Sequence, residues 1–352
     1  MIIEPFRFMT WLRLHGVDLL TVVLMAGIAL GVNYAPPVPT RMFPIYNAEG
    51  SIVYPELAHS RREQIIPIWA SALIGLFVPI FFFALFQIRR RSWDDFLTTT
   101  MGLLRSLLTS AVLQVIIKCL IGGLRPHFLA VCQPDITNKV GAGFRNIMFD
   151  SSVCTGNQEH IKDALKSMPS GHTTTAWAGL LYLALYFNAQ LKVVSGHNPA
   201  YWKMILFFAP LLGAVLMSMV LVKDSHHHWY DIVVGGIIGS ATALVAFRQT
   251  FAAIFDYRFN HLLLPRATSL FHRRPYLPVL GRGAYYTYQP INAIMPQDLP
   301  FAREGGWGYG VGEHASGAPG DATVLASSAV QHGISGAHRV AGGLSSNAVH
   351  LV

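Results

Sequence analysis

Apolar residues are grouped along the chain into six segments, each long enough to cross the ~30 Å hydrocarbon core of a bilayer. The polar stretches between them are rich in Arg, Pro and His. The pattern predicts an all-α integral membrane protein with six transmembrane helices. We expect the first segment to be a span and not a signal peptide, because it lacks a clean small-residue cleavage site. The segments are residues 17–34, 65–88, 96–120, 173–189, 204–222 and 229–247.

The composition agrees with a membrane protein. Hydrophobic residues make up 52% of the chain and charged residues 12%, whereas a soluble domain has about 25% charged residues. In a soluble chain the net charge of +8 would suggest a nucleic-acid partner. Here the basic residues flank the apolar segments, so orientation in the bilayer and anionic lipid headgroups explain them better, and we expect no nucleic-acid partner.

The basic residues also predict the orientation. They concentrate in the N-terminus (1–16), in Arg89–Arg91, in the connection around Lys192 and in the tail after the last segment. With six spans these parts share one side, which the positive-inside bias makes cytoplasmic. The remaining connections are then lumenal or extracellular, in an endomembrane or the plasma membrane. These outer connections are residues 35–64, 121–169 and 223–228.

The chain is thereby divided into three parts. A six-span domain (17–252) follows the N-terminus, and a cytoplasmic tail (253–352) follows the domain. Pro, Gly, Ala, Ser and His dominate the tail from about Asn260 onward. Such a composition cannot bury enough apolar surface to order the chain, so we expect the tail to be largely disordered.

Two basic residues, Arg105 and Lys118, lie inside the third apolar segment, and Arg125 follows it. Arg105 and Arg125 are 20 residues apart, about 30 Å of helix, so we expect each to reach one membrane interface. Lys118 would then lie about 10 Å below the outer surface. A lysine at that depth needs an anion.

Polar residues that carry chemistry form three clusters, all at the predicted outer ends of spans. Each cluster alone has an ordinary explanation. The first is typical of interface anchoring, the second of a helix cap, and the third of a metal-binding patch or an interfacial aromatic belt. The clusters are Lys118-x6-Arg125-Pro126, Pro169-Ser170-Gly171-His172 and His226-His227-His228-Trp229-Tyr230-Asp231.

Taken together, the three clusters favour a phosphate site. Two cations, which share one helix face if the helix continues past Gly122 and Gly123, and the free N–H groups at a helix N-terminus would hold the phosphate oxygens. Asp231 lies four residues after His227 and can set its tautomer. One histidine would attack phosphorus while the other protonates the leaving oxygen. Because no Asp/Glu cluster is present to hold magnesium, we expect a reaction without metal or other cofactor.

The three clusters resemble the motifs of the type 2 phosphatidate phosphatase (PAP2, lipid phosphate phosphatase) family, which read K-x6-R-P, P-S-G-H and S-R-x5-H-x3-D. The likeness covers roughly residues 35–251. It is similar above all to the fungal diacylglycerol pyrophosphate/phosphatidate phosphatase branch, which the first outer connection also resembles. The segments that carry this second likeness are Arg41-Met42-Phe43, Tyr54-Pro55-Glu56 and Glu63-Gln64-Ile65-Ile66-Pro67.

The resemblance implies a fold, a reaction and a set of roles. The fold is a six-helix membrane core of the PAP2/vanadium-haloperoxidase kind. The reaction is dephosphorylation of a membrane lipid phosphate, such as phosphatidate, lysophosphatidate or diacylglycerol pyrophosphate, at the lumenal or extracellular face. His227 would form a phosphohistidine, Asp231 would orient it, and His172 would be the acid. The phosphate-binding residues would be Lys118, Arg125, Ser170 and Gly171.

The third motif departs from the family pattern. Counted back from His227, its Ser-Arg pair falls on Val220-Leu221. The loss of one charged donor can cost about 10²–10³ in rate, and we expect Lys223 to replace it in part. Leu221 leaves open a catalytically weak lipid-phosphate binder or transporter. An isoprenoid-diphosphate or sphingoid-base phosphate phosphatase, or a scaffold acting through the tail, also remains open, and so does the oligomeric state.

The cysteines predict one crosslink. Cys132 and Cys154 both lie in the long outer connection, where the compartment is oxidising, so we expect a disulfide between them. Cys119 lies at the membrane edge, where we expect a packed thiol.

Overall fold

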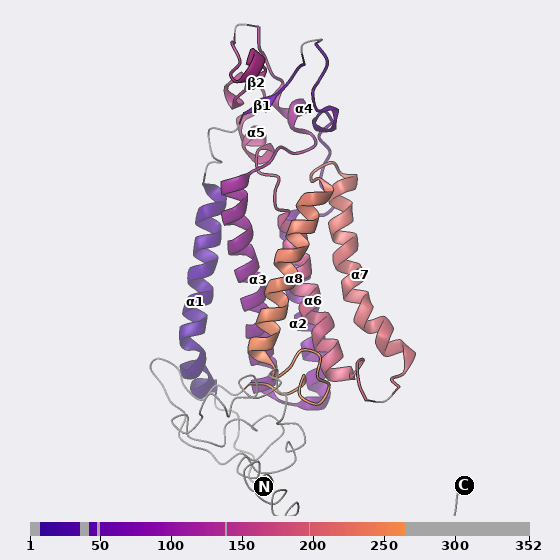
Figure 1. Cartoon of the computed structure of the whole chain (residues 1–352). Coiled ribbons are helices and arrows are strands. Elements are labelled where there is room, and N and C mark those ends of the chain that lie inside the picture. The colour runs from indigo at the N-terminus through magenta and orange to yellow at the C-terminus, as the bar shows by residue number, and fades with distance from the viewer. Residues whose placement is uncertain (1–7, 36–41, 48–49, 138, 197, 265–352) are drawn as a thin grey trace, which may run out of the picture. The chain divides into compact units, whose positions relative to one another are not determined.

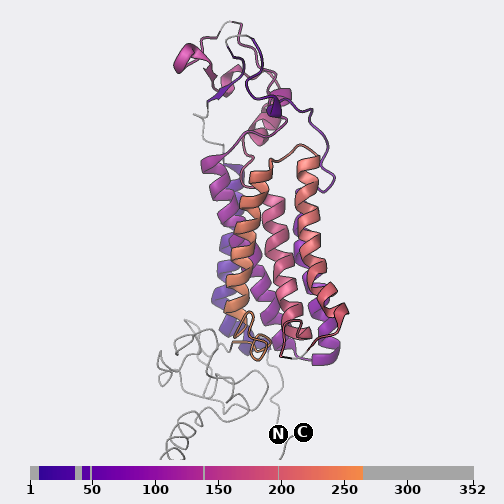
Figure 2. The same ribbon diagram turned by 45° about the vertical axis from the view of Figure 1, so that its right-hand side comes forward.

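The computed structural model describes residues 8–35, 42–47, 50–137, 139–196 and 198–264. Six long helices account for most of these residues, and they lie side by side in Figures 1 and 2. They are α1 (Phe8–Tyr34), α2 (Ile68–Arg90), α3 (Trp93–Ile121), α6 (Gly171–Leu191), α7 (Tyr201–Lys223) and α8 (Trp229–Thr250).

Five of these helices are long and apolar enough to cross a membrane. The exception is α6, so the prediction of six spans is not confirmed by length and composition. The reason lies in its surroundings, because α6 packs against α2, α3, α7 and α8, and Figure 2 shows it between α7 and α8. A helix that faces protein on most sides does not need the apolar surface that lipid requires.

Glycines allow α6 to approach its neighbours closely. A Cβ at Gly179 would lie 2.2 Å from the carbonyl oxygen of Gly75 in α2. A Cβ at Gly239 in α8 would lie 2.4 Å from the carbonyl oxygen of Thr174. Small residues at such crossings let backbones touch, and the crossing with α8 brings the start of α6 to the start of α8.

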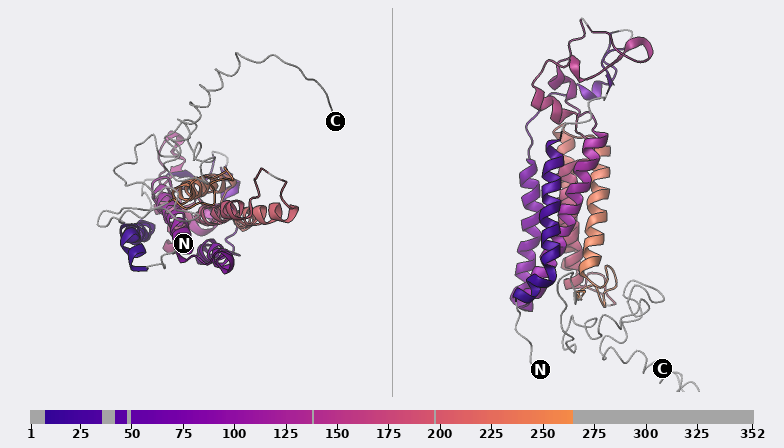
Figure 3. Two further views of the ribbon diagram at one scale, coloured as in Figure 1. Left: turned by 90° about the horizontal axis from the view of Figure 1, so that it is seen from below. Right: turned by 90° about the vertical axis from the view of Figure 1, so that its left-hand side faces the viewer.

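The first helix begins nearer the N-terminus than the predicted span, at Phe8, and packs against α3, as the right-hand view in Figure 3 shows. Arg105 of α3 donates a hydrogen bond to Asp18 of α1. Trp11 Nε1 donates to Thr98 Oγ1 at 3.2 Å. Arg105 is therefore paired with a carboxylate inside the bundle. The prediction that Arg105 reaches a membrane interface did not include this partner.

The third helix ends before Arg125. Gly122 caps it with φ of 67°, and Gly123 follows with φ of 117°, both in the region that favours glycine. Lys118 lies in the last turn of α3, whereas Arg125 lies beyond the helix. The prediction that both cations occupy one helix face is therefore wrong.

The outer connections fold together. We call the described residues of 42–67 and 122–170 the outer lobe. Its helices are α4 (Phe128–Cys132) and α5 (Gln158–Ala164), with 3₁₀ turns η1 (Pro55–Leu57), η2 (Phe144–Asn146) and η3 (Ser151–Val153). Strand β1 (Phe43–Pro44) pairs antiparallel with β2 (Met148–Phe149), which ties the two connections together.

The outer lobe has a hydrophobic core of its own. Phe43, Leu57, Phe128 and Ile161 are buried in one cluster and come from both connections. Lys166 ties the lobe to the end of α1, since its Nζ donates to the carbonyl oxygen of Asn33 at 3.2 Å. The outer connections are therefore a folded unit and not two independent loops.

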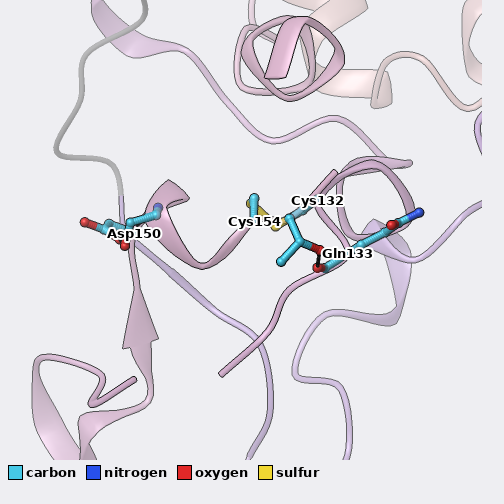
Figure 4. The surroundings of a disulfide bond; sticks show 6 residues. Cys132, Gln133, Asp150 and Cys154 are labelled. Carbon is cyan, nitrogen blue, oxygen red and sulfur yellow. Dashed lines mark hydrogen bonds between the residues drawn. A yellow bond between two sulfur atoms is a disulfide. The ribbon is translucent and has the colours of Figure 1, made fainter. Parts of the chain in front are cut away.

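Cys132 and Cys154 form a disulfide with a Cα–Cα distance of 4.5 Å, the pairing expected from the sequence (Figure 4). Close to it, Thr155 Oγ1 donates to the carbonyl oxygen of Gln133 at 2.7 Å. The free thiol of Cys119 is half-buried and donates to the carbonyl oxygen of Val32 at 3.2 Å.

Removal of the disulfide is expected to destabilise the outer lobe. The bond closes a loop with a sequence separation of 22, for which loop-closure entropy predicts about 3 kcal/mol. The variant Cys132→Ser/Cys154→Ser should therefore unfold at a lower temperature and be cleaved faster by protease in the lobe. Cys119→Ser is the control. Equal gel mobility of wild type with and without reductant, together with three free thiols, would contradict the prediction.

Residues 251–264 fold back on the bundle and do not belong to a disordered tail. Phe251 and Phe259 are fully buried. The Nζ of Lys192 donates to the carbonyl oxygen of Tyr257 at 2.6 Å and to Asn260 Oδ1 at 2.5 Å. The predicted domain boundary at residue 252 is thus too early. The rest of the tail prediction (265–352) lies outside the described residues, as do residues 1–7.

Candidate active site

Backbone hydrogen bonds join the three polar clusters. The N–H groups of Ser167 and Met168 donate to the carbonyl oxygens of Gly123 and Gly122 at 3.0 and 2.9 Å. The N–H of Ser170 donates to the carbonyl oxygen of Asp231 at 3.1 Å. Segments that are far apart in the sequence therefore meet where α3 ends and where α6 and α8 begin.

His227 and Asp231 lie at the centre of this junction. His227 is 2% exposed and Asp231 is fully buried, and Nδ1 of His227 lies 3.5 Å from Asp231 Oδ2. The same carboxylate oxygen accepts from Ser167 Oγ at 2.6 Å and from the N–H of His228 at 3.0 Å. Asp231 also completes a capping box at the start of α8. The carboxylate thus has a single orientation, and it faces Nδ1 of His227.

His227 is neutral at pH 7 in this environment. Burial lowers the pKa of its ring well below the usual range, and the positive charges of Arg125 and Lys118 lower it further, while Asp231 acts in the opposite direction. A neutral ring keeps one nitrogen lone pair. In the described part of the chain, the side-chain contacts of His227 run through Nδ1, so the lone pair falls on Nε2.

Arg125 is held at one end and unpartnered at the other. It is 5% exposed. Its Nε donates to the carbonyl oxygen of Asp163 at 3.1 Å, and its Nη2 donates to Asp163 Oδ1 at 2.8 Å. Its Nη1 is buried without a hydrogen-bond partner among the described residues. Lys118 is half-buried and interacts electrostatically with Arg125 and Asp231. The junction therefore holds two cations, and in the described part of the chain one of them has an unused donor.

The N-terminus of α6 carries His172 and the cap residue Ser170. Ser170 Oγ accepts from the N–H of Thr173 at 3.5 Å, so Ser170 also acts as an ordinary helix cap. His172 Nε2 lies 3.0 Å from the carbonyl oxygen of Ile66. A carbonyl only accepts, so Nε2 carries the hydrogen and Nδ1 is the nitrogen left for proton exchange. The half-buried Gly171 lies at the first helical position, beside the side chain of Gln114.

Lys223 differs from the other predicted site residues. Its side chain is exposed at the end of α7, whereas Leu221, at the position of the family arginine, is fully buried. The idea that Lys223 replaces the arginine stays a prediction.

Sequence reasoning missed several residues of the junction. Ser167 contacts both Asp231 and His227, Asp163 pairs with Arg125, and His127 and His226 are buried nearby. His226 belongs to the third polar cluster but had no assigned role, and His127 had a local signal because it directly follows Arg125-Pro126. Ser167 and Asp163 are identified by packing alone.

The comparisons with known proteins agree with this geometry. The model of the PAP2 superfamily matches residues 99–255, which include all three clusters. Lipid phosphate phosphatase 2 of Arabidopsis thaliana is 31% identical over 246 residues, covering 69% of this chain and 80% of that protein. Lipid phosphate phosphatase 1 of the same plant is 30% identical over 235 residues, covering 67% and 68%.

A fungal relative is also similar. Diacylglycerol pyrophosphate phosphatase 1 of Saccharomyces cerevisiae is 34% identical over 160 residues, covering 45% of this chain and 54% of that protein. No solved structure matches. With the three clusters assembled on a bundle of membrane helices, and with relatives that align over two thirds of both chains, the protein belongs to the PAP2 superfamily.

Proposed function

We propose that the protein is a lipid phosphate phosphatase that hydrolyses phosphate monoesters or pyrophosphates of membrane lipids. Phosphatidate, lysophosphatidate and diacylglycerol pyrophosphate are the expected substrates. The names of the plant and yeast relatives support this class. The observation that carries the proposal is the buried His227, held through Nδ1 by Asp231 beside the unpartnered Nη1 of Arg125.

The first step is transfer of the phosphoryl group to His227. Arg125, Lys118 and the N–H groups at the start of α6 would neutralise the phosphate oxygens. Nε2 of His227 attacks phosphorus while the bond to the lipid oxygen breaks. His172 carries a second proton, on Nδ1, once the phosphate dianion is bound, because a nearby anion favours the imidazolium, and it donates this proton to the lipid oxygen. Asp231 stabilises the positive charge that develops on the attacking ring.

The second step releases phosphate. The deprotonated His172 takes a proton from a water molecule, which attacks phosphorus and breaks its bond to Nε2 of His227. The dephosphorylated lipid, one inorganic phosphate and the original protonation states result. Each proton and each charge is handled by side chains of this chain, which supports a reaction without metal.

The location of the junction suits a lipid headgroup. It lies at the C-terminal end of α3 and at the N-terminal ends of α6 and α8. Arg90 lies shortly before the start of α3, and Lys192 and Arg248 lie at or near the C-terminal ends of α6 and α8. By the positive-inside bias, the junction is then lumenal or extracellular. A lipid at this depth keeps its acyl chains in the bilayer while its phosphate reaches the site.

The test is phosphate release by the purified full-length protein in mixed micelles. We expect wild type to release phosphate from phosphatidate, to retain activity in EDTA and to be inhibited by vanadate, which mimics the five-coordinate phosphorus. A panel that adds diacylglycerol pyrophosphate, isoprenoid diphosphate and sphingoid-base phosphate ranks the substrates. Saturable binding of phosphatidate without phosphate release from any of these would favour the lipid-phosphate binder.

A further inference from the structure

Two buried histidines next to the candidate site have no role in the reaction described above. His127 and His226 are 2% and 4% exposed. Their ring centroids are 4.9 Å apart in an edge-to-face arrangement. His127 follows Arg125-Pro126, and His226 precedes His227. Burial of two polar rings in contact requires a partner for each of their nitrogens.

One nitrogen of each ring contacts a backbone carbonyl oxygen. Nδ1 of His127 lies 2.8 Å from the carbonyl oxygen of Ser225, and Nδ1 of His226 lies 3.1 Å from the carbonyl oxygen of Asp224. Because a carbonyl only accepts, both Nδ1 atoms carry hydrogen. Each neutral ring is then left with the lone pair of its Nε2, and in the described part of the chain neither Nε2 is among the fully buried polar atoms without a partner. The two Nε2 atoms are therefore the nitrogens of the pair that can contact a ligand.

The charges that act on this pair are those of the candidate site. Arg125 and Asp163 interact electrostatically with both rings, Asp224 acts on His226, and His226 acts in turn on His172. Arg125 itself has a buried, unpartnered Nη1. The two histidine rings and the guanidinium nitrogen that has no partner among the described residues thus belong to one polar cluster.

The backbone of Leu221 orients the second histidine. Its carbonyl oxygen accepts from the N–H of His226 at 3.0 Å and from that of His227 at 3.3 Å. Ser225, with φ of 56°, makes the turn that directs both N–H groups to this one carbonyl. The side chain of Leu221 cannot donate a hydrogen bond, but its backbone positions a residue that can.

We propose that Nε2 of His127 and Nε2 of His226 bind the substrate phosphate together with Arg125, each holding a proton when the anion is bound. This inference rests on the proposed phosphatase function, since a phosphate ester is the anion that the site would hold. On this inference, the two histidines supply the hydrogen-bond donors that the family arginine would supply at the position of Leu221.

Binding of the anion should then be linked to proton uptake. Burial, and after it the charge of Arg125, lowers the pKa of His127 to about 4, while its contact with Ser225 and the charge of Asp163 act in the opposite direction. The pKa of His226 is lowered for the same reasons. Both rings are neutral at pH 7 without an anion. A dianion next to Nε2 favours the imidazolium and raises both pKa values. The affinity for the anion therefore rises as the pH falls through the raised pKa values of the anion-bound protein.

The experiment uses tungstate, a tetrahedral dianion that does not titrate between pH 6 and pH 8. Calorimetry on the full-length protein in detergent measures the dissociation constant of tungstate at pH 6 and at pH 8. His127→Asn and His226→Asn retain a donor at the place of Nδ1 and remove Nε2. We expect each to weaken binding at pH 6 roughly tenfold or more and to flatten the pH dependence. His226→Gln, whose amide donates near the place of Nε2 without an added proton, should restore binding but not the pH dependence. His160→Asn, an exposed histidine of the outer lobe, is the matched control.

Phosphate release from phosphatidate, measured on the same wild-type preparation, separates the two proposals. An active wild type whose Asn variants bind tungstate with unchanged affinity and pH dependence would overturn the histidine pair alone. An inactive wild type with histidine-dependent tungstate binding would overturn the phosphatase and support the pair.

A second measurement needs no variant. Diethyl pyrocarbonate acylates neutral imidazole, and mass spectrometry assigns each modified residue. Saturating tungstate should slow the modification of His127 and His226 at least tenfold and leave that of His160 unchanged. Modification of the pair at an unchanged rate, with His227 protected, would overturn the inference.

Discussion

Replacement of His227 by alanine is expected to abolish phosphate release from phosphatidate, with a loss of about 10⁴-fold or more. His227 is buried, its Nδ1 faces Asp231 Oδ2 at 3.5 Å, and burial keeps the pKa of its ring well below the usual range. A neutral ring with an available Nε2 is the nucleophile of the proposed reaction. Nδ1 of His228 also lies 3.6 Å from Asp231 Oδ2, but its ring stacks on Tyr230. The measurement is kcat in mixed micelles.

Two further variants make this result specific. His227→Asn retains a donor to Asp231 in place of Nδ1 and removes only the attacking nitrogen, so it should be as inactive as the alanine variant while unfolding at nearly the wild-type temperature. His160→Ala should be as active as wild type, because this histidine is exposed and contacts Arg61. With labelled substrate, wild type should form an acid-labile, alkali-stable phosphoprotein that both His227 variants lack. More than a few per cent of wild-type turnover in His227→Asn would rule out this residue as the nucleophile.

Asp231→Asn should have the second largest effect, a fall in kcat of about 10³–10⁴-fold with little change in KM. Asp231 Oδ2 accepts from Ser167 Oγ at 2.6 Å and from the N–H of His228 at 3.0 Å. An asparagine keeps this shape. If its amide nitrogen takes the place of Oδ2 and donates to Nδ1 of His227, the ring hydrogen moves to Nε2 and the attacking lone pair is lost, together with the hydrogen bonds that Oδ2 accepts from Ser167 and His228.

The control for this variant is another Asp→Asn change in the outer lobe. Asp135 is exposed and accepts from Thr137 Oγ1 at 2.7 Å, so Asp135→Asn should leave kcat and KM unchanged. Asp231→Asn must also remain folded at the assay temperature, which the unfolding transition checks, since the amide fills the same buried volume. A fall in kcat of less than tenfold would show that Asp231 holds the start of α8 and does not set the tautomer of His227.

Part of this fold was predictable because the signal is local. A segment that must cross hydrocarbon is long and apolar wherever its neighbours lie, so the six long helices were anticipated at nearly their observed positions. The exceptions are informative. α1 begins earlier, at Phe8, and α3 ends before Arg125 because Gly122 and Gly123 adopt positive φ. Glycine permits this conformation without requiring it, so the sequence alone did not decide where α3 ends.

Contacts between distant segments were not predictable in the same way. The outer lobe pairs strands of two residues each, which are too short for a periodic pattern, and the core around Phe43 and Phe128 depends on how two connections meet. Arg105 has a partner in Asp18 only because α1 packs against α3. Residues 251–264, which are rich in Phe and Leu, fold back on the bundle and bury Phe251 and Phe259 there, a contact that no local pattern specified.

The same difference between local signals and long-range contacts applies to the candidate site. The sequence by itself determined the membrane class, the three polar clusters and the expected pairing of Cys132 with Cys154, because spacing within a helix and the compartment of a loop are local properties. Only the tertiary structure decided that Ser167 supports Asp231, that Asp163 holds Arg125, and that His127 packs against His226. These contacts join residues tens of positions apart, and the close crossing of α6 and α8 at Gly239 is one of the packing details that bring them together.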